Sequence, residues 1–299
     1  MDSIRRFFRG RQKPPPDQAS TAPLDPAKLP EPFVDLVRQH LSVGSAQSIG
    51  QERKTNDDAL LVISGSAESN DGIPDFGLFC VADGLGGYEN GAQASAVAVR
   101  VLAQGLTQGA LLDVLSAESK ENLASIEDIV TLAIQQANRE VRARAKGGAT
   151  TLTSALVIGG SITLGHVGDS RAYLVQPSGI ELLTRDHSLV QELIETGTIT
   201  EEQAIDHPQR NVLWNAMGKA LDVKVDAKSV PFPAGANLVL CSDGLWGVIG
   251  DESIKRIVLE SASPQLACEE LVKAANDSGG PDNVTVIVVH KPDIRLLST

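Results

Sequence analysis

Two stretches of this sequence run from an apolar segment directly into an aspartate followed by a glycine. Residues 78–82 precede Asp83, and residues 238–242 precede Asp243. A continuous apolar run of this length is typical of a strand that is covered on both faces. The glycine that follows each aspartate lets the backbone turn sharply and expose its carbonyl groups. We call these two turns the elbows, and they predict two buried strands that end at one common site.

A third aspartate stands at the start of the last apolar run. Asp282 and Asn283 open residues 284–289, which we expect to form the final strand. A single Asp-Gly is equally typical of an ordinary turn, so the hypothesis depends on the whole set. We expect Asp83, Asp243 and Asp282 to meet at one edge of a sheet core. Hard oxygen ligands of this kind suit Mg²⁺ or Mn²⁺, whereas zinc prefers nitrogen and sulfur.

Length and composition fit a globular protein. The chain has 299 residues, 42% of them hydrophobic, which suits one or two domains with a sizeable core. No apolar run approaches the roughly 18 residues of a membrane span, and the basic N-terminus lacks the apolar segment of an export signal. Cys80, Cys241 and Cys268 have no metal-ligand spacing, so we expect small buried side chains in a cytoplasmic protein. Oxidant sensing beside the elbows is the alternative for Cys80 and Cys241.

The net charge of −12 disfavours nucleic acid as a partner, because phosphate backbones need basic surfaces. Residues 1–13 are the exception, with five basic residues, one acidic residue and two phenylalanines. We favour a solvated, disordered tail here, and contact with an anionic membrane surface or an acidic partner is the alternative. Seven prolines between residues 14 and 32 favour an extended linker. The expected organisation is a tail and linker at 1–32, a folded domain at 33–292 and a short tail at 293–299.

The expected strands and helices do not alternate regularly. Strands are expected at residues 46–50, 59–63, 78–82, 150–158, 162–167, 172–176, 180–184, 223–232, 237–242 and 284–289. Helices are expected at residues 92–106, 124–145, 251–260 and 264–277. Residues 186–220 are polar and helical in pattern, and we call this insert the flap. The short connections among the middle strands favour hairpins, so the order predicts an α+β fold with antiparallel sheet rather than a parallel one.

Further carboxylates lie in loops of similar character. Asp57 and Asp58 precede one expected strand, and Asp169 follows another. Clustered carboxylates repel one another and cost desolvation energy unless a cation lies among them. Two divalent ions about 3.5–4 Å apart can hold and activate one water for in-line attack, as in many phosphatases and nucleases. Arg53 is expected to bind a phosphate bidentately, and an ion pair with Asp57 or Asp58 is the alternative.

Six short motifs follow one another along roughly residues 43–291. They are Arg53-x-x-Asn56-Asp57-Asp58, Asp83-Gly84-Leu85-Gly86-Gly87, Gly148-Ala149-Thr150-Thr151, Gly168-Asp169-Ser170-Arg171-Ala172-Tyr173, Ser242-Asp243-Gly244-Leu245-Trp246 and Asp282-Asn283. This ordered series resembles that of the protein phosphatase 2C family, the metal-dependent serine/threonine phosphatases. One motif alone is weak evidence, but six in order are specific. The flap resembles the flap subdomain of the family's bacterial branch.

The resemblance implies a fold and a principal set of metal ligands. The implied fold is a four-layer α-β-β-α sandwich of two antiparallel sheets flanked by helices, with residues 33–292 as the catalytic domain. Asp83 is implied to bridge two Mn²⁺ or Mg²⁺ ions. The carbonyl of Gly84 is implied to bind one ion, and Asp243 and Asp282 the other.

The resemblance also implies roles around these ligands. Asp57 acts through the metal or its waters, and Asp58 lies behind the ligands. Arg53 holds the substrate phosphate. Asp169 joins Asp243 in the third, weaker metal site of bacterial members.

The implied reaction is hydrolysis of phosphoserine and phosphothreonine in proteins by an activated water, without a phosphoenzyme. The implied partners are phosphorylated proteins, including a serine/threonine kinase or its substrates. Members of the animal branch have a histidine after the first Asp-Gly, where this chain has Leu85. A metal-bound water is therefore the expected proton donor, and we expect His187 and His207 in the flap to be structural. The competing hypotheses are a catalytically silent binding module and a metal-dependent nuclease.

Overall fold

The computed structural model describes residues 40–66, 74–85, 90–111 and 125–293. All of them belong to one unit, Arg38–Ile294. The expected N-terminal tail, the predicted start of the folded domain at residue 33 and residues 294–299 lie outside the described residues. No helix in the described ranges is long and apolar enough to cross a membrane.

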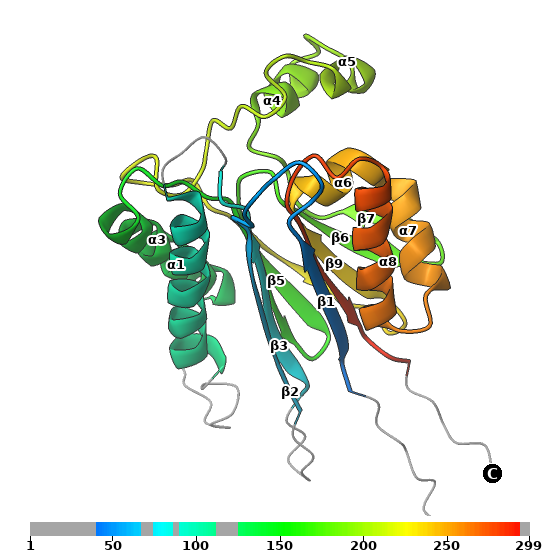
Figure 1. Ribbon diagram of the computed structural model, residues 1–299. Helices are drawn as coiled ribbons and strands as arrows, with labels where there is room; N and C mark the ends of the chain where they lie inside the picture. Colours follow the sequence, from blue (N-terminus) through cyan, green and yellow to red (C-terminus); the bar gives the residue numbers. More distant parts are fainter. Residues whose placement is uncertain (1–39, 67–73, 86–89, 112–124, 294–299) are drawn as a thin grey trace, which may run out of the picture. The chain divides into compact units, whose positions relative to one another are not determined.

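Two antiparallel sheets of five strands form the centre of the unit (Figure 1). The first sheet has the strand order β1-β10-β9-β6-β7, and the second has the order β2-β3-β4-β5-β8. The strands are β1 (Ser42–Ser48), β2 (Ala59–Gly65), β3 (Phe76–Ala82), β4 (Leu152–Ile158), β5 (Ser161–Val167), β6 (Arg171–Gln176), β7 (Gly179–Leu182), β8 (Asp226–Pro231), β9 (Asn237–Cys241) and β10 (Val284–His290). The predicted antiparallel α+β class is confirmed.

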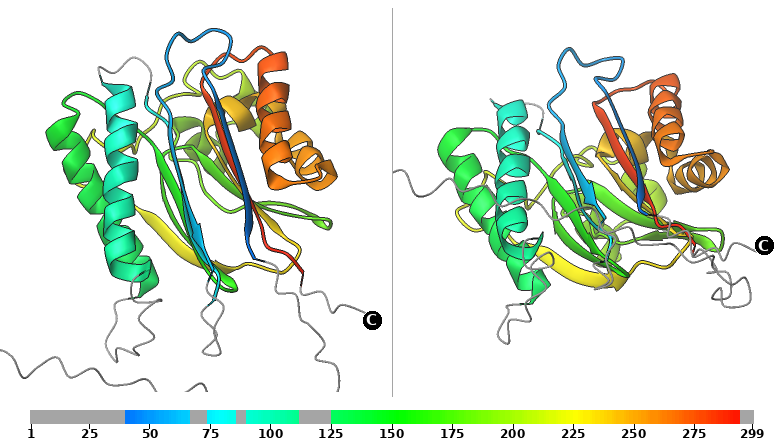
Figure 2. Two further views of the ribbon diagram at one scale, coloured as in Figure 1. Left: turned by 60° about the horizontal axis from the view of Figure 1, so that its bottom comes forward. Right: turned by 90° about the horizontal axis from the view of Figure 1, so that it is seen from below.

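Helices cover the outer face of each sheet (Figures 1 and 2). Helices α1 and α3 pack on the second sheet, and α6, α7 and α8 pack on the first. The helices are α1 (Gly91–Leu106), the π-helical turn η2 (Thr107–Leu111), α3 (Ile126–Arg144), α4 (Leu189–Glu195), α5 (Glu201–Ile205), α6 (Asp243–Ile249), α7 (Asp251–Glu260) and α8 (Pro264–Asp277). The expected four-layer sandwich is therefore confirmed.

Strand β3 shows why the segment before the first elbow is apolar throughout. Leu78 and Cys80 are fully buried in the apolar cluster shared with α1 and α3. Phe79 and Val81 point the other way and are fully buried between the two sheets. Because successive side chains of a strand face opposite sides, a strand buried on both faces has no polar positions. Pairing with β2 and β4 then fixes where the strand ends, at Asp83.

Two elements differ from the prediction. Strand β1 begins at Ser42 rather than Ala46 and pairs with β10 along its whole length. Its residues are mostly Ser, Gly and Gln, so apolar alternation does not mark its start. Helix α6 begins at Asp243, so the second elbow is the first turn of a helix rather than an isolated turn. Gly244 and Gly247 have low helix propensity, which hid this helix in the sequence.

The flap contains the two short helices α4 and α5, as its polar pattern predicted (Figure 1). Neither helix has a buried residue. Ser188 begins α4 as its N-cap, and Thr200 forms a capping box at α5. Local capping therefore stabilises these helices more than tertiary packing does.

Candidate active site

Three strand ends bring Asp83, Asp243 and Asp282 together. Asp83 follows β3 of the second sheet, while Asp243 follows β9 and Asp282 precedes β10 in the first. Strands β9 and β10 are neighbours, and Cys241 pairs with Val286 just inside the site. Burial and then the charge of Asp243 raise the pKa of Asp83 well above its usual range. Burial and then the charge of Asp282 raise the pKa of Asp243. The predicted carboxylates therefore interact at one edge of the sandwich.

The backbone holds the first elbow from two sides. The Asp83 amide donates to Thr151 Oγ1 at 2.9 Å, and the Asp83 carbonyl accepts from the Thr151 amide at 2.9 Å. The Gly84 amide donates to the Asp57 carbonyl at 3.2 Å, and a Cβ at Gly84 would lie 2.4 Å from that oxygen. Only glycine fits this close approach. No hydrogen bond from the described residues reaches the Gly84 carbonyl oxygen, so that oxygen is available as a ligand.

Asp58 lies behind the second elbow, as the sequence indicated. Its Oδ2 accepts hydrogen bonds from Ser242 Oγ at 2.9 Å and Thr285 Oγ1 at 2.6 Å. Burial raises the pKa of Asp58 to about 7, and the charges of Asp243 and Asp282 add to this. Asp58 therefore holds Ser242, the residue that immediately precedes Asp243.

Asp57 and Asn283 link the loop of residues 49–57 to the start of β10. The Asp57 amide donates to Asn283 Oδ1 at 2.8 Å. Asn283 Nδ2 donates to the carbonyls of Ile49 and Thr55 at 3.0 and 2.8 Å. Asn283 belongs to the last of the six sequence motifs, but the sequence did not indicate a role for it. Its function is to position the loop that carries Asp57.

Asp169 lies close enough to Asp243 for the two carboxyl groups to interact electrostatically. Asp169 is buried, and burial followed by the charge of Asp243 raises its pKa well above the usual range. Its carbonyl accepts a hydrogen bond from Trp246 Nε1 at 3.0 Å. The Arg171 guanidinium stacks 3.5 Å above the Trp246 ring and pairs with Asp186 at 2.8 Å. Trp246 and Arg171 lie in two of the six sequence motifs. The sequence alone did not show that their side chains hold the loop that contains Asp169.

The donor set fits hard divalent ions. Asp58 Oδ1 and Asp243 Oδ1 are buried and have no hydrogen-bond partner among the described residues. Such atoms are costly unless a cation satisfies them. In the described ranges, no three His, Cys, Asp or Glu side chains already form a compact metal-ligand cluster. Carboxylates, backbone carbonyls and water are the ligands that Mg²⁺ and Mn²⁺ commonly take.

Comparison with known proteins agrees with this geometry. Residues 50–273 match the family model described as protein phosphatase 2C. This chain belongs to the protein phosphatase 2C family. The phosphatase is 36% identical over 248 residues to the serine/threonine phosphatase stp of Listeria monocytogenes, covering 81% of this chain and 92% of the relative. The resemblance inferred from the six motifs is confirmed, and so is the enzyme class, a serine/threonine protein phosphatase of the metal-dependent type.

Solved structures agree with the fold of this phosphatase. The serine/threonine phosphatase of S. agalactiae superposes with a TM-score of 0.72 at 31% identity, covering 84% of this chain and all of that one. The catalytic domain of the serine/threonine phosphatase PstP, solved in complex with two manganese ions, superposes with a TM-score of 0.68 at 28% identity. It covers 85% of this chain and 99% of that one. Divalent metal dependence of the phosphatase follows from its family.

Arg53 pairs with Asp282 rather than with the aspartates of the alternative ion pair, and its expected role in binding phosphate stays a prediction. Its Nη2 donates to Asp282 Oδ2 at 2.7 Å, and neither Asp57 nor Asp58 is its partner. This hydrogen bond raises the pKa of Arg53. The Arg53 side chain is 42% exposed, so most of its N–H donors face solvent at the mouth of the site. Arg53 is therefore beside a metal-ligand candidate and open to an incoming phosphate.

The two flap histidines bind groups other than Asp83, Asp243 and Asp282. His187 is buried at the base of the flap, 3.0 Å from Asp226 Oδ2. His207 Nδ1 accepts from the Gln209 amide in an exposed turn. Leu85 occupies the position after the first elbow and is only partly buried. No described histidine has the place of the animal-branch proton donor.

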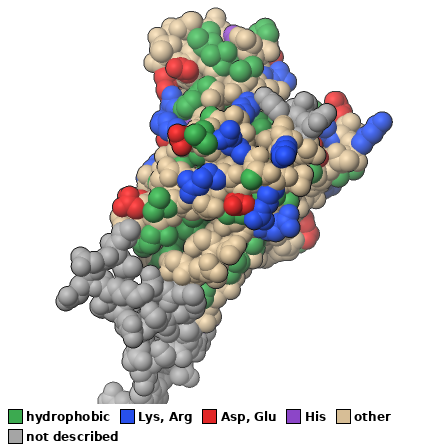
Figure 3. All heavy atoms as spheres, turned by 90° about the vertical axis from the view of Figure 1, so that its left-hand side faces the viewer, with side chains coloured by type: hydrophobic (Ala, Val, Ile, Leu, Met, Phe, Trp, Pro, Cys, Tyr) green, Lys and Arg blue, Asp and Glu red, His purple; other side chains and the backbone are tan. Residues whose placement is uncertain are grey.

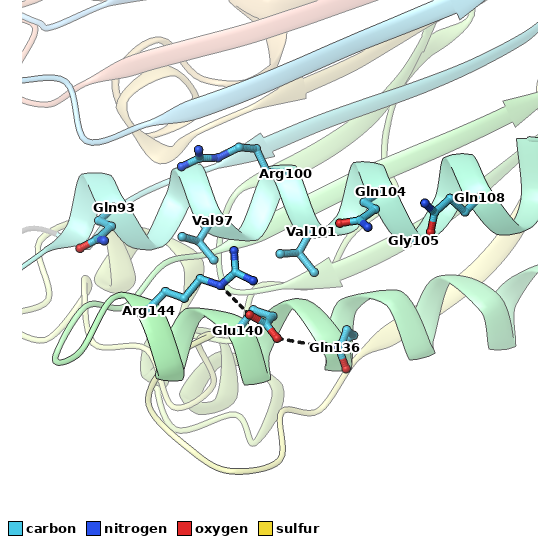
Figure 4. A pocket seen from close by; sticks show the side chains of 10 residues that line it. All are labelled: Gln93, Val97, Arg100, Val101, Gln104, Gly105, Gln108, Gln136, Glu140 and Arg144. Atoms are coloured by element: carbon cyan, nitrogen blue, oxygen red, sulfur yellow. Dashed lines mark hydrogen bonds and ion pairs between the residues drawn. The ribbon is translucent and has the colours of Figure 1, made fainter.

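A groove of about 660 Å³ lies between α1 and α3 (Figure 4). Arg100 and Arg144 line it, and Arg144 pairs with Glu140 at 2.6 Å. Figure 3 shows that basic side chains gather on this outer face. None of the aspartates described above lines the groove. The sheet edge, where the interacting carboxylates lie, is therefore the candidate active site.

Proposed function

We propose that this phosphatase hydrolyses phosphoserine and phosphothreonine in proteins with two divalent ions, Mn²⁺ or Mg²⁺. Asp83, the Gly84 carbonyl, Asp243 and Asp282 would hold them. The observation that supports this most is the set of partly buried, mutually repelling carboxylates in which the buried Asp243 Oδ1 has no partner in the described chain. Such ions supply a water of lowered pKa and positive charge opposite the phosphoryl oxygens.

The protein's own residues orient the ligands and the substrate. Asp58 holds Ser242 and so fixes the backbone before Asp243. Arg53 keeps one N–H on Asp282 and presents its other donors to two phosphoryl oxygens of the substrate. Asp57 is placed by Asn283 to bind waters around the ions.

Asp169 is proposed to share a third, weaker divalent site with Asp243. The proximity of the two charges, which raises the pKa of Asp169, supports this assignment. A leaving serine or threonine oxygen also needs a proton. Leu85 has none to give, so we assign the donor role to a water in the site.

Phosphorylated proteins are the proposed substrates, among them a serine/threonine kinase or the proteins that it modifies. The three cysteines are free and buried, which supports a reducing, cytoplasmic location. The expected head at residues 1–13 stays a proposal, either as a solvated tail or as a membrane-surface contact.

The test is a phosphopeptide assay with phosphoserine, phosphothreonine and phosphotyrosine versions of one sequence. We expect release of phosphate from the first two in Mn²⁺ or Mg²⁺, loss of activity in EDTA, and recovery when the metal is restored. Full activity after chelation and dialysis would contradict the metal assignment. A preference for phosphotyrosine would contradict the substrate class.

A further inference from the structure

His187 is a buried side chain that the proposed chemistry does not use. It lies at the point where the chain enters the flap, and its side chain is 0% exposed. Its carbonyl accepts a hydrogen bond from the Trp214 amide at 3.1 Å, where the chain leaves the flap. The two ends of the flap therefore meet at His187.

The hydrogen bonds of His187 define its tautomer. Nδ1 lies 3.2 Å from the Gly168 amide nitrogen and 2.8 Å from Asn215 Nδ2. A backbone amide can only donate, so Nδ1 is an acceptor and carries no proton. The ring proton is then on Nε2, which donates to Asp226 Oδ2 at 3.0 Å. Both ring nitrogens therefore make hydrogen bonds, Nδ1 with Gly168 and Nε2 with Asp226.

The Nδ1 contact acts on the residue immediately before Asp169. Gly168 is buried and has a φ of +110°, and a Cβ there would lie 2.6 Å from the Thr151 side chain. The His187 amide donates to the Gly168 carbonyl at 2.7 Å, while Gly168 donates back to the His187 ring. Two hydrogen bonds therefore fix the peptide groups on both sides of Gly168, at a backbone conformation that other residues rarely adopt. The direction of Asp169 depends on the conformation of Gly168.

We propose that His187 is a positioning residue, whose Nδ1 holds Gly168 and thereby aims Asp169 at the third divalent site. Because His187 also joins the two ends of the flap, it links the placement of the flap to the geometry of that site. The inference rests on the proposed role of Asp169. Residues that orient metal ligands typically change metal affinity by about 10–100-fold when they are replaced.

Two conservative variants test the two ring nitrogens of His187 separately. In His187→Asn, the amide oxygen takes the place of Nδ1 and keeps the bond to Gly168. In His187→Gln, the amide nitrogen takes the place of Nε2 and keeps the bond to Asp226, but the acceptor for Gly168 is lost. Asp226→Asn is the matched control, because it changes only the outer partner of the ring.

The first readout needs no metal and no catalysis. Hydrogen exchange of the Gly168 amide in the metal-free protein should become about 10-fold faster or more in His187→Gln. It should stay near the wild-type rate in His187→Asn and Asp226→Asn. The amide of Cys80 in β3 reports global stability and should not change in any of the variants.

The second readout is metal binding and turnover. Calorimetry should show that His187→Gln weakens the weakest Mn²⁺ site by about 10-fold or more, with the tighter sites unchanged. Its kcat should fall at low Mn²⁺ and recover at high Mn²⁺, while KM for a phosphopeptide stays the same. His187→Asn should restore wild-type behaviour.

Equal losses in His187→Asn and His187→Gln would overturn the proposal, since packing alone would then explain both. An unchanged weakest site in His187→Gln would overturn it as well. If Asp169→Asn leaves all Mn²⁺ sites intact while Gly168 exchange still responds to His187, the assignment of Asp169 fails instead. The wild-type protein gives an independent arm by ¹⁵N NMR. Mg²⁺ should change the chemical shifts of the Gly168 amide and the His187 ring over the same range of concentration. A His187 ring signal that does not respond to Mg²⁺ would contradict the proposed connection between His187 and the third divalent site.

Discussion

Asp243 is the residue at which most interactions of the candidate site converge. Its charge raises the pKa of both Asp83 and Asp169, and Asp58 supports the residue before it. We predict that Asp243→Asn lowers kcat on a phosphothreonine peptide by about 100-fold or more at saturating Mn²⁺, because a charged ligand is lost while the shape is kept. The metal-free variant should unfold at the same temperature as wild type or higher, since one buried charge is gone.

Kinetics at a series of Mn²⁺ concentrations and thermal unfolding by circular dichroism check this prediction. Asp277→Asn, an exposed carboxylate on α8, is the matched control and should leave both quantities unchanged. Turnover of Asp243→Asn close to wild type would remove Asp243 from the site.

His166 gives the phosphatase a pH-dependent contribution to stability. Its Nε2 lies 3.0 Å from the Arg185 carbonyl, and its Nδ1 lies 2.9 Å from Thr153 Oγ1. Burial and the charge of His187 lower the pKa of His166 from 6.5 to about 3, although Asp226 opposes this. In the unfolded chain, His166 therefore becomes protonated as the pH falls through about 6.5, whereas in the folded protein it stays neutral down to about pH 3. Stability is present above pH 6.5 and is lost as the pH falls toward 3.

We predict that this residue makes the free energy of unfolding fall by about 1.4 kcal/mol for each pH unit below 6. His166→Gln should flatten the profile by that amount, because glutamine can still donate to the Arg185 carbonyl without titrating. Urea unfolding between pH 5 and 7.5 measures the difference between the two proteins. Parallel profiles for variant and wild type would show that His166 is not the group responsible.

At the scale of single residues, the sequence marks the candidate ligands more clearly than the residues that support them. Asp83, Asp243 and Asp282 are marked by apolar runs that end beside them. Asn283 and His187 act by binding backbone groups that are far away in sequence. Those contacts exist only once the sheets have paired, so no local pattern could have indicated them.

At the scale of elements, the flap is the part that packs least. Helices α4 and α5 have no buried residues, whereas β5 in the core is buried at all but its first position. Glu195 is paired with Arg185 through Nε at 2.6 Å, so it has a structural role. Glu192, Glu201 and Glu202 are exposed. An element with few buried contacts opens more readily than the core does.

We predict that replacing Glu192, Glu201 and Glu202 by Gln changes KM for phosphopeptides several-fold, in a way that depends on peptide sequence. Hydrolysis of p-nitrophenyl phosphate should stay the same, because this small ester does not reach the flap. The control variant replaces three exposed glutamates on α7 and α8 and makes the same change in charge: Glu252, Glu260 and Glu269. Steady-state kinetics on both substrates decide. An equal fall on both would mean that the flap shapes the site itself.

The sequence gives most elements but misses those without a local apolar signal. Helix α3 is marked by Ser125 as N-cap, by Glu127 and Asp128 in its first turn and by arginines at its end. Helix α6 has Ser242 as N-cap, Asp243 in its first turn and Gly250 at its end, but it has only seven residues, two of which are glycines, so no helical period stands out. Strand β1 is visible only through its pairing with β10, at the other end of the described chain.

At the scale of the whole molecule, the layer order comes from long-range pairing. Residues at the two ends of the described chain form neighbouring strands, β1 and β10, and β9 lies beside them. Periodicity predicts each strand but not its neighbours, so the sandwich was implied by the family motifs rather than by apolar patterns. The same pairing brings carboxylates from both sheets to one edge, and this makes folding and metal binding interdependent.

The last prediction follows from that interdependence. In the metal-free protein, burial and mutual repulsion raise the pKa values of Asp83, Asp169 and Asp243, so binding of divalent ions must displace protons. Binding to the folded state alone stabilises it by about 2.7 kcal/mol per site at 100 times Kd. We therefore expect Mn²⁺ to raise Tm by several degrees and to release protons, which calorimetry in buffers of different ionisation enthalpy detects. The rise in Tm should weaken as the pH falls, whereas the number of protons released per bound ion should grow, because more of the carboxyl groups are then protonated in the metal-free protein. Both effects should be smaller in Asp243→Asn. A Tm that ignores Mn²⁺ would mean that the carboxylates do not bind the ion.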